Sequence, residues 1–369
     1  MRATRRGQGG VTVQDVARAA GVSAMTVSRV VNGGQNVRES TRAAVIEAID
    51  RLQYKPNPAA RSLAVGEATQ IGLLYANPST AYLSQFLIGA LAAARRAGCH
   101  LVLEPCEGES AEEQAEATRQ FAATDVQGVI LPPPLSESPP VRAELEAANI
   151  PSVSIAMGRR EAGSLNVRID DFEAAAAMTR HLIELGHRDI GFIRGHPNQV
   201  ASHERHRGFI HAVEAAGIEP GRVRVEQGYF TYRSGLSAAE RLLQRSPRPT
   251  AIFASNDDMA AAAVGVAHRQ GLHIPRDISI VGFDDVALAT NIWPELTTVR
   301  QPIAQMAETA VGMLLAHLRK RGGTDFADQE ELVLPHELVI RESCGAPPGD
   351  AQTVAAPPRR RRTARTAMR

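Results

Sequence analysis

The chain has 369 residues and a formal net charge of +1, with 44% apolar and 22% charged residues. This composition is ordinary for a globular protein, and the length predicts two or three globular units. No apolar run approaches the roughly 20 residues that cross a bilayer, and the first eight residues are basic and polar, unlike a secretory signal. We therefore exclude membrane and exported proteins and expect the chain to stay in the cytoplasm.

The small net charge hides an uneven distribution along the chain. Residues 1–64 carry +6 and residues 346–369 carry +5, which leaves −10 for the segment between them. A polyanion such as nucleic acid would therefore be attracted to the two ends and repelled by the middle.

The first folded segment, residues 11–54, has apolar residues at helical spacing with breaks at Gly21 and at residues 32–34. This pattern predicts a bundle of three short helices. Gly21 supplies the positive φ of a tight turn, and Ser23 is placed to cap the second helix. Two helices joined by such a turn are typical of a helix-turn-helix DNA reader.

The second predicted helix has a polar face suited to the major groove. Arg29 has the shape to pair with guanine, and Ala24 and Met25 suit contacts with base edges or a thymine methyl group. Thr26 and Ser28 suit the oxygens of the DNA backbone. A purely structural helix hairpin would explain the pattern but not the local charge of +6, so we interpret this helix as a recognition helix.

From Ile71 onward, short apolar runs alternate with Ala-rich amphipathic segments, which predicts two parallel sheets covered by helices on both faces. The candidate strands are 71–76, 100–104, 128–131, 152–155, 190–194, 251–254 and 279–283. The candidate helices are 81–97, 173–185, 203–216, 233–244, 258–270 and 303–321.

The predicted organisation has five parts. They are a disordered basic arm at 1–10, a helix-turn-helix domain at 11–56, a linker at 57–66, a core at 67–345 and a disordered basic tail at 346–369. The tail lacks leucine heptads, which favours a dimer over a tetramer.

Two stretches carry a specific resemblance: VTVQDVARAAGVSAMTVSRVVN at 11–32, and YKPN with AARSLA between 54 and 64. They resemble the lactose and galactose repressor (LacI/GalR) family, and the similarity continues to about Arg341. The resemblance implies an all-α helix-turn-helix domain followed by a periplasmic-binding-protein-like core of two parallel-sheet, Rossmann-like subdomains. It also implies a hinge helix at 58–64 that folds on DNA and inserts Leu63 into the minor groove.

The DNA contacts that we expect come from the reader, its flanks and the hinge. They are Thr12, Ser23, Ala24, Met25, Thr26, Ser28, Arg29, Asn32, Tyr54, Asn57, Ala60, Arg61 and Leu63.

Polar residues follow two predicted strands of the core, as Asn256–Asp257 and Asp284–Asp285. Ligands of such folds bind beyond the carboxyl ends of the strands, and carboxylates and amides suit sugar hydroxyls. Carried over residue by residue, the resemblance implies effector contacts at Tyr82, Leu83, Arg205, Phe230, Asn256, Asp284 and Gln301.

Several of these residues also have a purely structural interpretation. Asp257 and Asp285 would cap helices, Gln301 would satisfy a crossover strand, and Phe230 would belong to the core. Where the lactose-binding branch of the family has an acid after the strand at 152–155, this chain has Ala156-Met-Gly. The identity of the sugar is therefore not carried over, and a resemblance of 11–30 and 171–191 to the gluconate-responsive branch keeps a sugar acid open.

The sequence thus predicts a repressor of carbohydrate-utilisation genes that reads a near-palindromic operator in double-stranded DNA as a homodimer. A sugar or sugar-acid effector would change its DNA affinity. Release of DNA is the first hypothesis for the response and corepression is the alternative. The main rival, a periplasmic-type sugar-binding protein, would need an export signal and no DNA reader.

We expect neither catalysis nor a metal or other cofactor. The chain has no G-x-S-x-G, P-loop or G-x-G-x-x-G motif, so an enzyme is the third alternative. His203, His206 and His211 lack the H-E-x-x-H spacing of a zinc site, and the three cysteines form no C-x-x-C pair.

Overall fold

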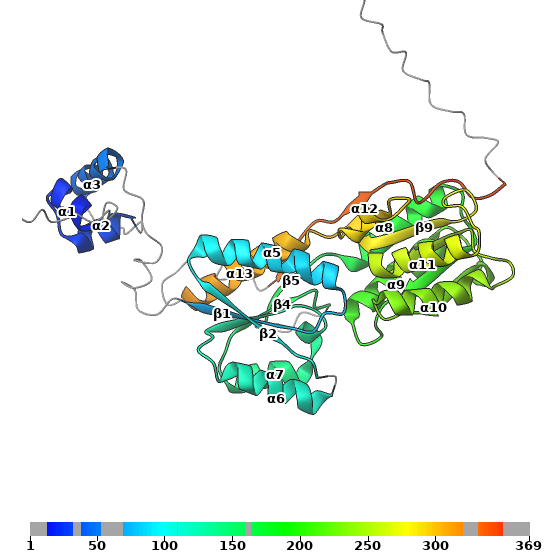
Figure 1. Cartoon of the computed structure of the whole chain (residues 1–369), viewed down its shortest axis with the longest axis horizontal. Coiled ribbons are helices and arrows are strands. Elements are labelled where there is room, and N and C mark those ends of the chain that lie inside the picture. The colour runs from blue at the N-terminus through cyan, green and yellow to red at the C-terminus, as the bar shows by residue number, and fades with distance from the viewer. Residues whose placement is uncertain are drawn as a thin grey trace, which may run out of the picture. The chain divides into compact units, whose positions relative to one another are not determined.

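The computed structural model describes residues 13–31, 38–52, 69–108, 110–158, 164–319 and 331–349. The chain divides into two compact units, Met1–Thr69 and Gln70–Arg369, which are considered separately (Figure 1). Among the described residues, no helix is both long and apolar enough to span a bilayer.

The small unit is a bundle of three helices, as predicted: α1 (Val13–Ala20), α2 (Ala24–Val31) and α3 (Glu39–Leu52). Gly21 has a φ of +65°, which makes the tight turn between α1 and α2. The Ser23 hydroxyl accepts a hydrogen bond from the Thr26 amide at 3.1 Å and caps α2. The core of this unit consists of six buried apolar side chains, Val16, Ala17, Val27, Val30, Val45 and Ala48.

The larger unit contains two α/β subdomains. The first has a six-stranded sheet in the order β11-β5-β4-β3-β1-β2, with all neighbouring strands parallel. Its strands are β1 (Gln70–Tyr75), β2 (His100–Pro105), β3 (Gly128–Leu131), β4 (Ser152–Ile155), β5 (Leu165–Arg168) and β11 (Glu331–Val333). Helices α5 (Thr80–Ala97) and α13 (Ile303–Arg319) pack together on one face, and α6 (Ala111–Ala122) and α7 (Pro139–Ala147) on the other (Figure 1).

The second subdomain has a six-stranded sheet in the order β12-β10-β9-β8-β6-β7. Its strands are β6 (Ile190–Arg194), β7 (Val223–Gln227), β8 (Ala251–Ala254), β9 (Ser279–Asp284), β10 (Thr297–Arg300) and β12 (Glu337–Val339). Only the pair β10–β12 is antiparallel, so this sheet is mixed rather than wholly parallel as expected. Helix α8 (Asp171–Glu184) packs with α9 (Val200–Ala215), and α10 (Tyr232–Leu243) packs with α11 (Asp257–Arg269); a short α12 (Leu288–Asn291) follows β9.

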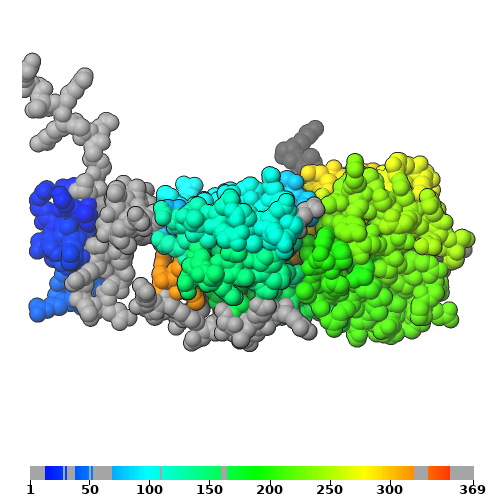
Figure 2. All heavy atoms as spheres, turned by 90° about the horizontal axis from the view of Figure 1, so that it is seen from below, coloured from blue at the N-terminus to red at the C-terminus, as the bar shows by residue number. Residues whose placement is uncertain are grey.

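The chain crosses between the two subdomains three times, at 168–171, 300–303 and 333–337. As a result α13 and β11 return to complete the first subdomain after the second has formed most of its sheet. One cluster of buried apolar residues contains side chains of both subdomains, including Phe86 of the first and Phe192 and Phe209 of the second. Figure 2 shows the two lobes of this unit next to each other, the first in cyan and teal and the second in green and yellow.

Each predicted strand and helix of the core is present, with ends that differ by at most three residues. The strands and α-helices of the core that the sequence did not predict are β5, β7, β10, β11, β12, α6, α7 and α12. The predicted DNA contact at Thr12, the predicted hinge at 57–66 and most of the two predicted disordered ends lie outside the described residues.

Candidate functional site

A cavity of about 40 Å³ lies between the two subdomains of the larger unit. Six of the seven predicted effector residues line it; the seventh, Leu83, is half-buried and is not among its lining residues. The predicted residues that line it are Tyr82, Arg205, Phe230, Asn256, Asp284 and Gln301. Since pockets for small ligands usually measure about 300–1,000 Å³, the cleft is narrow in this conformation.

Arg205, on α9, is the centre of the cavity wall and is 4% exposed. Its Nε donates to Asp171 Oδ1 at 2.8 Å and its Nη1 donates to the Ser255 carbonyl oxygen at 2.6 Å. The guanidinium carbon lies 3.6 Å from the centroid of the Phe283 ring, and Asp284 Oδ1 lies 3.5 Å from Nη1. This buried cation is therefore stacked on an aromatic face and paired with two carboxylates, as a desolvated guanidinium requires.

Asp284 ends β9 and has a φ of +110°, which is rare for a residue with a side chain. Its Oδ1 accepts a hydrogen bond from Gln301 Nε2 at 2.6 Å. Burial raises the pKa of Asp284 to about 7, although Arg205 and Gln301 lower it. The strained backbone and the shifted pKa mark this residue as a functional candidate.

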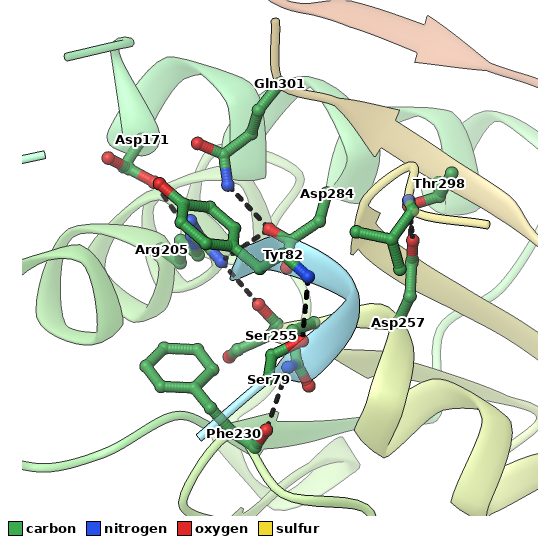
Figure 3. Close-up of polar contacts among 12 residues, drawn as sticks. Ser79, Tyr82, Asp171, Arg205, Phe230, Ser255, Asp257, Asp284, Thr298 and Gln301 are labelled. Atoms are coloured by element: carbon green, nitrogen blue, oxygen red, sulfur yellow. Dashed lines mark hydrogen bonds and ion pairs between the residues drawn. The ribbon is translucent and has the colours of Figure 1, made fainter. Parts of the chain in front are cut away.

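Tyr82 reaches the cavity from α5, on the opposite subdomain (Figure 3). Burial raises its pKa, and the nearby Asp284 raises it further. Its hydroxyl oxygen is buried and has no hydrogen-bond partner within the described part of the chain. A buried hydroxyl in this condition costs about 1–3 kcal/mol, and a polar group of a bound ligand would remove that cost.

Two of the predicted effector residues also support the fold. Asn256 caps α11, because its Oδ1 accepts from the Met259 amide at 3.0 Å while its Nδ2 donates to the Phe230 carbonyl oxygen at 3.0 Å. Phe230 has a φ of +60° and packs in a second apolar cluster. Phe230 therefore has the core role that was named as its alternative, Asn256 has a capping role that was not predicted, and both residues still line the cavity.

The neighbouring acids do not cap helices as the structural alternative expected. Asp257 is buried and accepts hydrogen bonds from Thr298 Oγ1 at 2.7 Å and from the Val286 amide at 2.9 Å. Asp285 forms ion pairs with Arg300 and Arg341, both at 2.7 Å. These acids fix the loop that follows β9, outside the cavity lining.

Sequence reasoning missed two parts of the cleft. Asp171, the first residue of α8, is the closest carboxylate to Arg205, and its only signal was an acid two residues before a predicted helix. Ser79 also lines the cavity and donates to Asp258 Oδ2 at 2.6 Å, which joins the two subdomains. Only the fold brings these partners, distant in sequence, together.

The small unit presents the predicted reading residues at the start of α2. Ser23, Ala24 and Met25 are exposed, Met25 by 67%, and Thr26 is half-buried. Ser28 and Arg29 lie within α2. The other expected DNA contacts are outside the described residues: Thr12, Asn32, Tyr54, Asn57, Ala60, Arg61 and Leu63.

Comparisons with known proteins agree with this two-part organisation. Residues 12–57 match the family of bacterial regulatory proteins, lacI family, and residues 179–344 match the periplasmic binding protein-like domain. The chain is 32% identical over 334 residues to catabolite control protein A of Priestia megaterium, which covers 90% of this chain and 99% of that protein. It is 35% identical over 336 residues to the HTH-type transcriptional repressor PurR of Yersinia enterocolitica, with 90% and 96% covered.

Solved structures are similar over the same length. The complex of the transcriptional regulator CelR with cellobiose has a TM-score of 0.68 at 32% identity and covers 90% of this chain and 99% of its own. The lac repressor dimer bound to operator and the anti-inducer ONPF has a TM-score of 0.68 at 28% identity, with 92% and 100% covered.

These relatives are named as regulators and repressors of transcription, and they share the helix-turn-helix and the two-subdomain core described above. The chain belongs to the lacI family of bacterial regulatory proteins. It is a transcription regulator with a DNA-binding domain and a ligand-binding core, which confirms the predicted family and fold class.

Proposed function

We propose that this protein represses genes of carbohydrate use by binding a near-palindromic operator as a homodimer, and that a neutral sugar in the cleft releases it from DNA. The observation that carries the ligand-binding part is the buried group of Arg205, Asp171, Asp284 and Tyr82 between the two subdomains. A repressor acts on the chromosome, so it works in the cytoplasm, and nothing in this reading requires catalysis.

The reading of DNA is supported by the exposed start of α2 and by the charge of +6 on residues 1–64. A helix N-terminus attracts phosphate, and the side chains beside it reach base edges. Two copies related by a twofold axis place two such helices in successive major grooves. The lac repressor structure is described as a dimer bound to operator, which supports the same assembly here.

The charges of the cleft favour a neutral polyhydroxyl ligand over a sugar acid. Arg205 is the one cation among the lining residues, and two carboxylates and a carbonyl oxygen already engage it. Asp258 adds a third carboxylate close by. An added carboxylate or phosphate would find no unengaged cation among the lining residues in this site of low dielectric constant, whereas sugar hydroxyls can bond to Asp284 in either protonation state and accept from Tyr82.

Binding in the cleft would act on DNA affinity through a preference for one angle between the two subdomains. The effector can shift this equilibrium only by the ratio of its affinities for the two states. If it prefers the state with low operator affinity it induces transcription, which is our first choice; the opposite preference would make it a corepressor.

The proposal is tested by two measurements on the full chain. Fragments of the source genome are selected by binding at low salt, and the protein is screened by thermal shift against neutral sugars and their matched sugar acids. We expect a specific fragment to be retained, and a neutral sugar to raise the melting temperature and release that fragment. Binding to no fragment, with or without the panel, would overturn the proposal.

Two variants separate the functions of the two units. Arg29→Ala should abolish specific operator binding and leave the sugar-induced thermal shift intact. Asp284→Ala should remove the thermal shift and the release by sugar while operator binding persists. If both variants behave like the wild type in gel shifts, the assigned residues are wrong.

A further inference from the structure

Glu137 forms a hydrogen bond from one subdomain to the other. It ends the short 3-10 helix η1 (Leu135–Glu137), which lies between β3 and β4 in the first subdomain. Its Oε2 accepts a hydrogen bond at 2.9 Å from the backbone amide of Val200, the first residue of α9 in the second subdomain.

This contact satisfies the first amide of α9, and the side chain of the residue before the helix forms no capping hydrogen bond of its own. Helices α5, α6, α7, α8, α10 and α11 each begin after a Ser, Thr, Asp or Asn whose side chain accepts a hydrogen bond from the first turn. The N-cap residue of α9 is Gln199, whose side chain makes no such bond. The capping oxygen of α9 therefore comes from the other subdomain, where the carboxylate also faces the positive end of the helix.

The surroundings show that this contact belongs to a closed cleft. Burial raises the pKa of Glu137, and hydrogen bonding with the backbone of Val200 and of Gly158 lowers it, so the carboxylate is held partly out of water where the two subdomains meet. Beside it, a Cβ atom on Gly158 of the first subdomain would lie 1.8 Å from Val200 Cγ1. Only a residue without a side chain allows the two subdomains to approach this closely at α9.

Helix α9 is also the helix that carries Arg205, the central cation of the cavity. Opening of the cleft would break the hydrogen bond between Glu137 and Val200 and expose the first turn of α9 to solvent. Within the described ranges, hydrogen bonds from Ser79 to Asp258 and from Gln85 to the Asp285 carbonyl oxygen also cross the cleft, and they come from the N-cap and the body of α5. Glu137 thus supplies a link from a separate element.

We propose that Glu137 is a positioning residue that favours the closed cleft by capping the Arg205 helix across the subdomain boundary. The inference rests on one part of the proposed function, namely that the effector regulates the angle between the two subdomains. Its test uses neither effector nor operator, so its failure and a failure of the proposed function are distinguishable.

The experiment measures the closure of the full-length protein by electron–electron distances between spin labels. Labels are placed at Gln120→Cys on α6 and Ser237→Cys on α10, which are both exposed, in a background with Cys344→Ser because Cys99 and Cys106 are buried. We expect Glu137→Ala to lower the population at the closed separation at least threefold. Glu137→Gln keeps an acceptor oxygen and should restore most of that population.

The matched control is Glu113→Ala, which removes a capping carboxylate from α6 whose hydrogen bonds stay inside the first subdomain. It should leave the distance distribution as in the wild type. Gly158→Ala provides a second variant, because the added methyl group would press against Val200 and should lower the closed population while the Glu137 side chain is kept. A Glu137→Ala distribution equal to that of the wild type, or an equal change in Glu113→Ala, overturns the proposal.

Discussion

Asp284 shows how a single side chain can connect ligand binding with protonation. Its backbone is strained, it shares Arg205 with Asp171, and burial raises its pKa to about 7. The folded protein therefore keeps a proton on Asp284 at pH values at which the unfolded chain, with an ordinary pKa near 3.9, has lost it. Between these two values the folded state binds more protons than the unfolded state.

The sign of the pH dependence follows from this difference. Stability falls as the pH rises wherever the native state binds more protons, so Asp284 costs stability that increases from about pH 4 and is complete above about pH 7. We expect the free energy of unfolding of the wild type, minus that of Asp284→Asn, to fall by up to about 1.4 kcal/mol per pH unit in this window. Urea denaturation of both proteins at several pH values measures it, and a difference that is flat or rises with pH would contradict the assignment.

At this scale the sequence could predict which residues line the cleft but not how they pair. Arg205, Asp284 and Gln301 follow strand ends or start helices, and the resemblance placed them near a ligand. Asp171 stands 34 positions before Arg205, and no local pattern reports that the two meet. Asn256 shows a related limit, because the resemblance placed it near a ligand, whereas the capping role that was expected of Asp257 belongs to Asn256 in the structure.

At the scale of elements, strands that are apolar runs were predictable, whereas strands that are polar or very short were not. Strands β3, β4 and β8 are short apolar runs that are buried along nearly their whole length. Strand β7 alternates apolar and charged residues at the sheet edge, and β11 and β12 are three residues long, so none of them stands out from a loop. Helices α6 and α7 cover one face of a sheet with few large apolar side chains, which explains why the pattern missed them.

The packing of α8 against α9 depends on a glycine at their crossing. A Cβ atom on Gly208 would lie 2.1 Å from the Phe172 carbonyl oxygen, so the backbones touch there. We expect Gly208→Ala to destabilise the core by about 2 kcal/mol, because a backbone atom cannot yield as a side chain can. Urea denaturation of the core measures the change.

The matched control is Gly312→Ala in α13, where a Cβ atom would meet nothing within 4 Å. This substitution should stabilise the protein by about 0.5–1 kcal/mol, since alanine favours a helix over glycine. If the two substitutions change the free energy of unfolding equally, then close packing at Gly208 does not stabilise the pair of α8 and α9.

At the scale of the whole molecule, the chain path determines which parts can unfold independently. The small unit has its own core of six side chains and is separate from the rest by its contacts. The two subdomains of the core are different, because α13 and β11 belong to the first subdomain but follow most of the second in sequence. Neither subdomain is a continuous segment, and one apolar cluster runs through both.

We therefore expect two thermal transitions in the full-length protein rather than three. A unit with so small a core should unfold at the lower temperature and with the smaller enthalpy, and both subdomains should unfold together in the other transition. Differential scanning calorimetry can resolve the two. A neutral sugar that binds the cleft should raise only the transition of the core, by an amount that grows with the logarithm of its concentration. A third transition would contradict the cooperative unfolding of the two subdomains. A sugar that shifts only the transition of the small unit would contradict binding in the cleft.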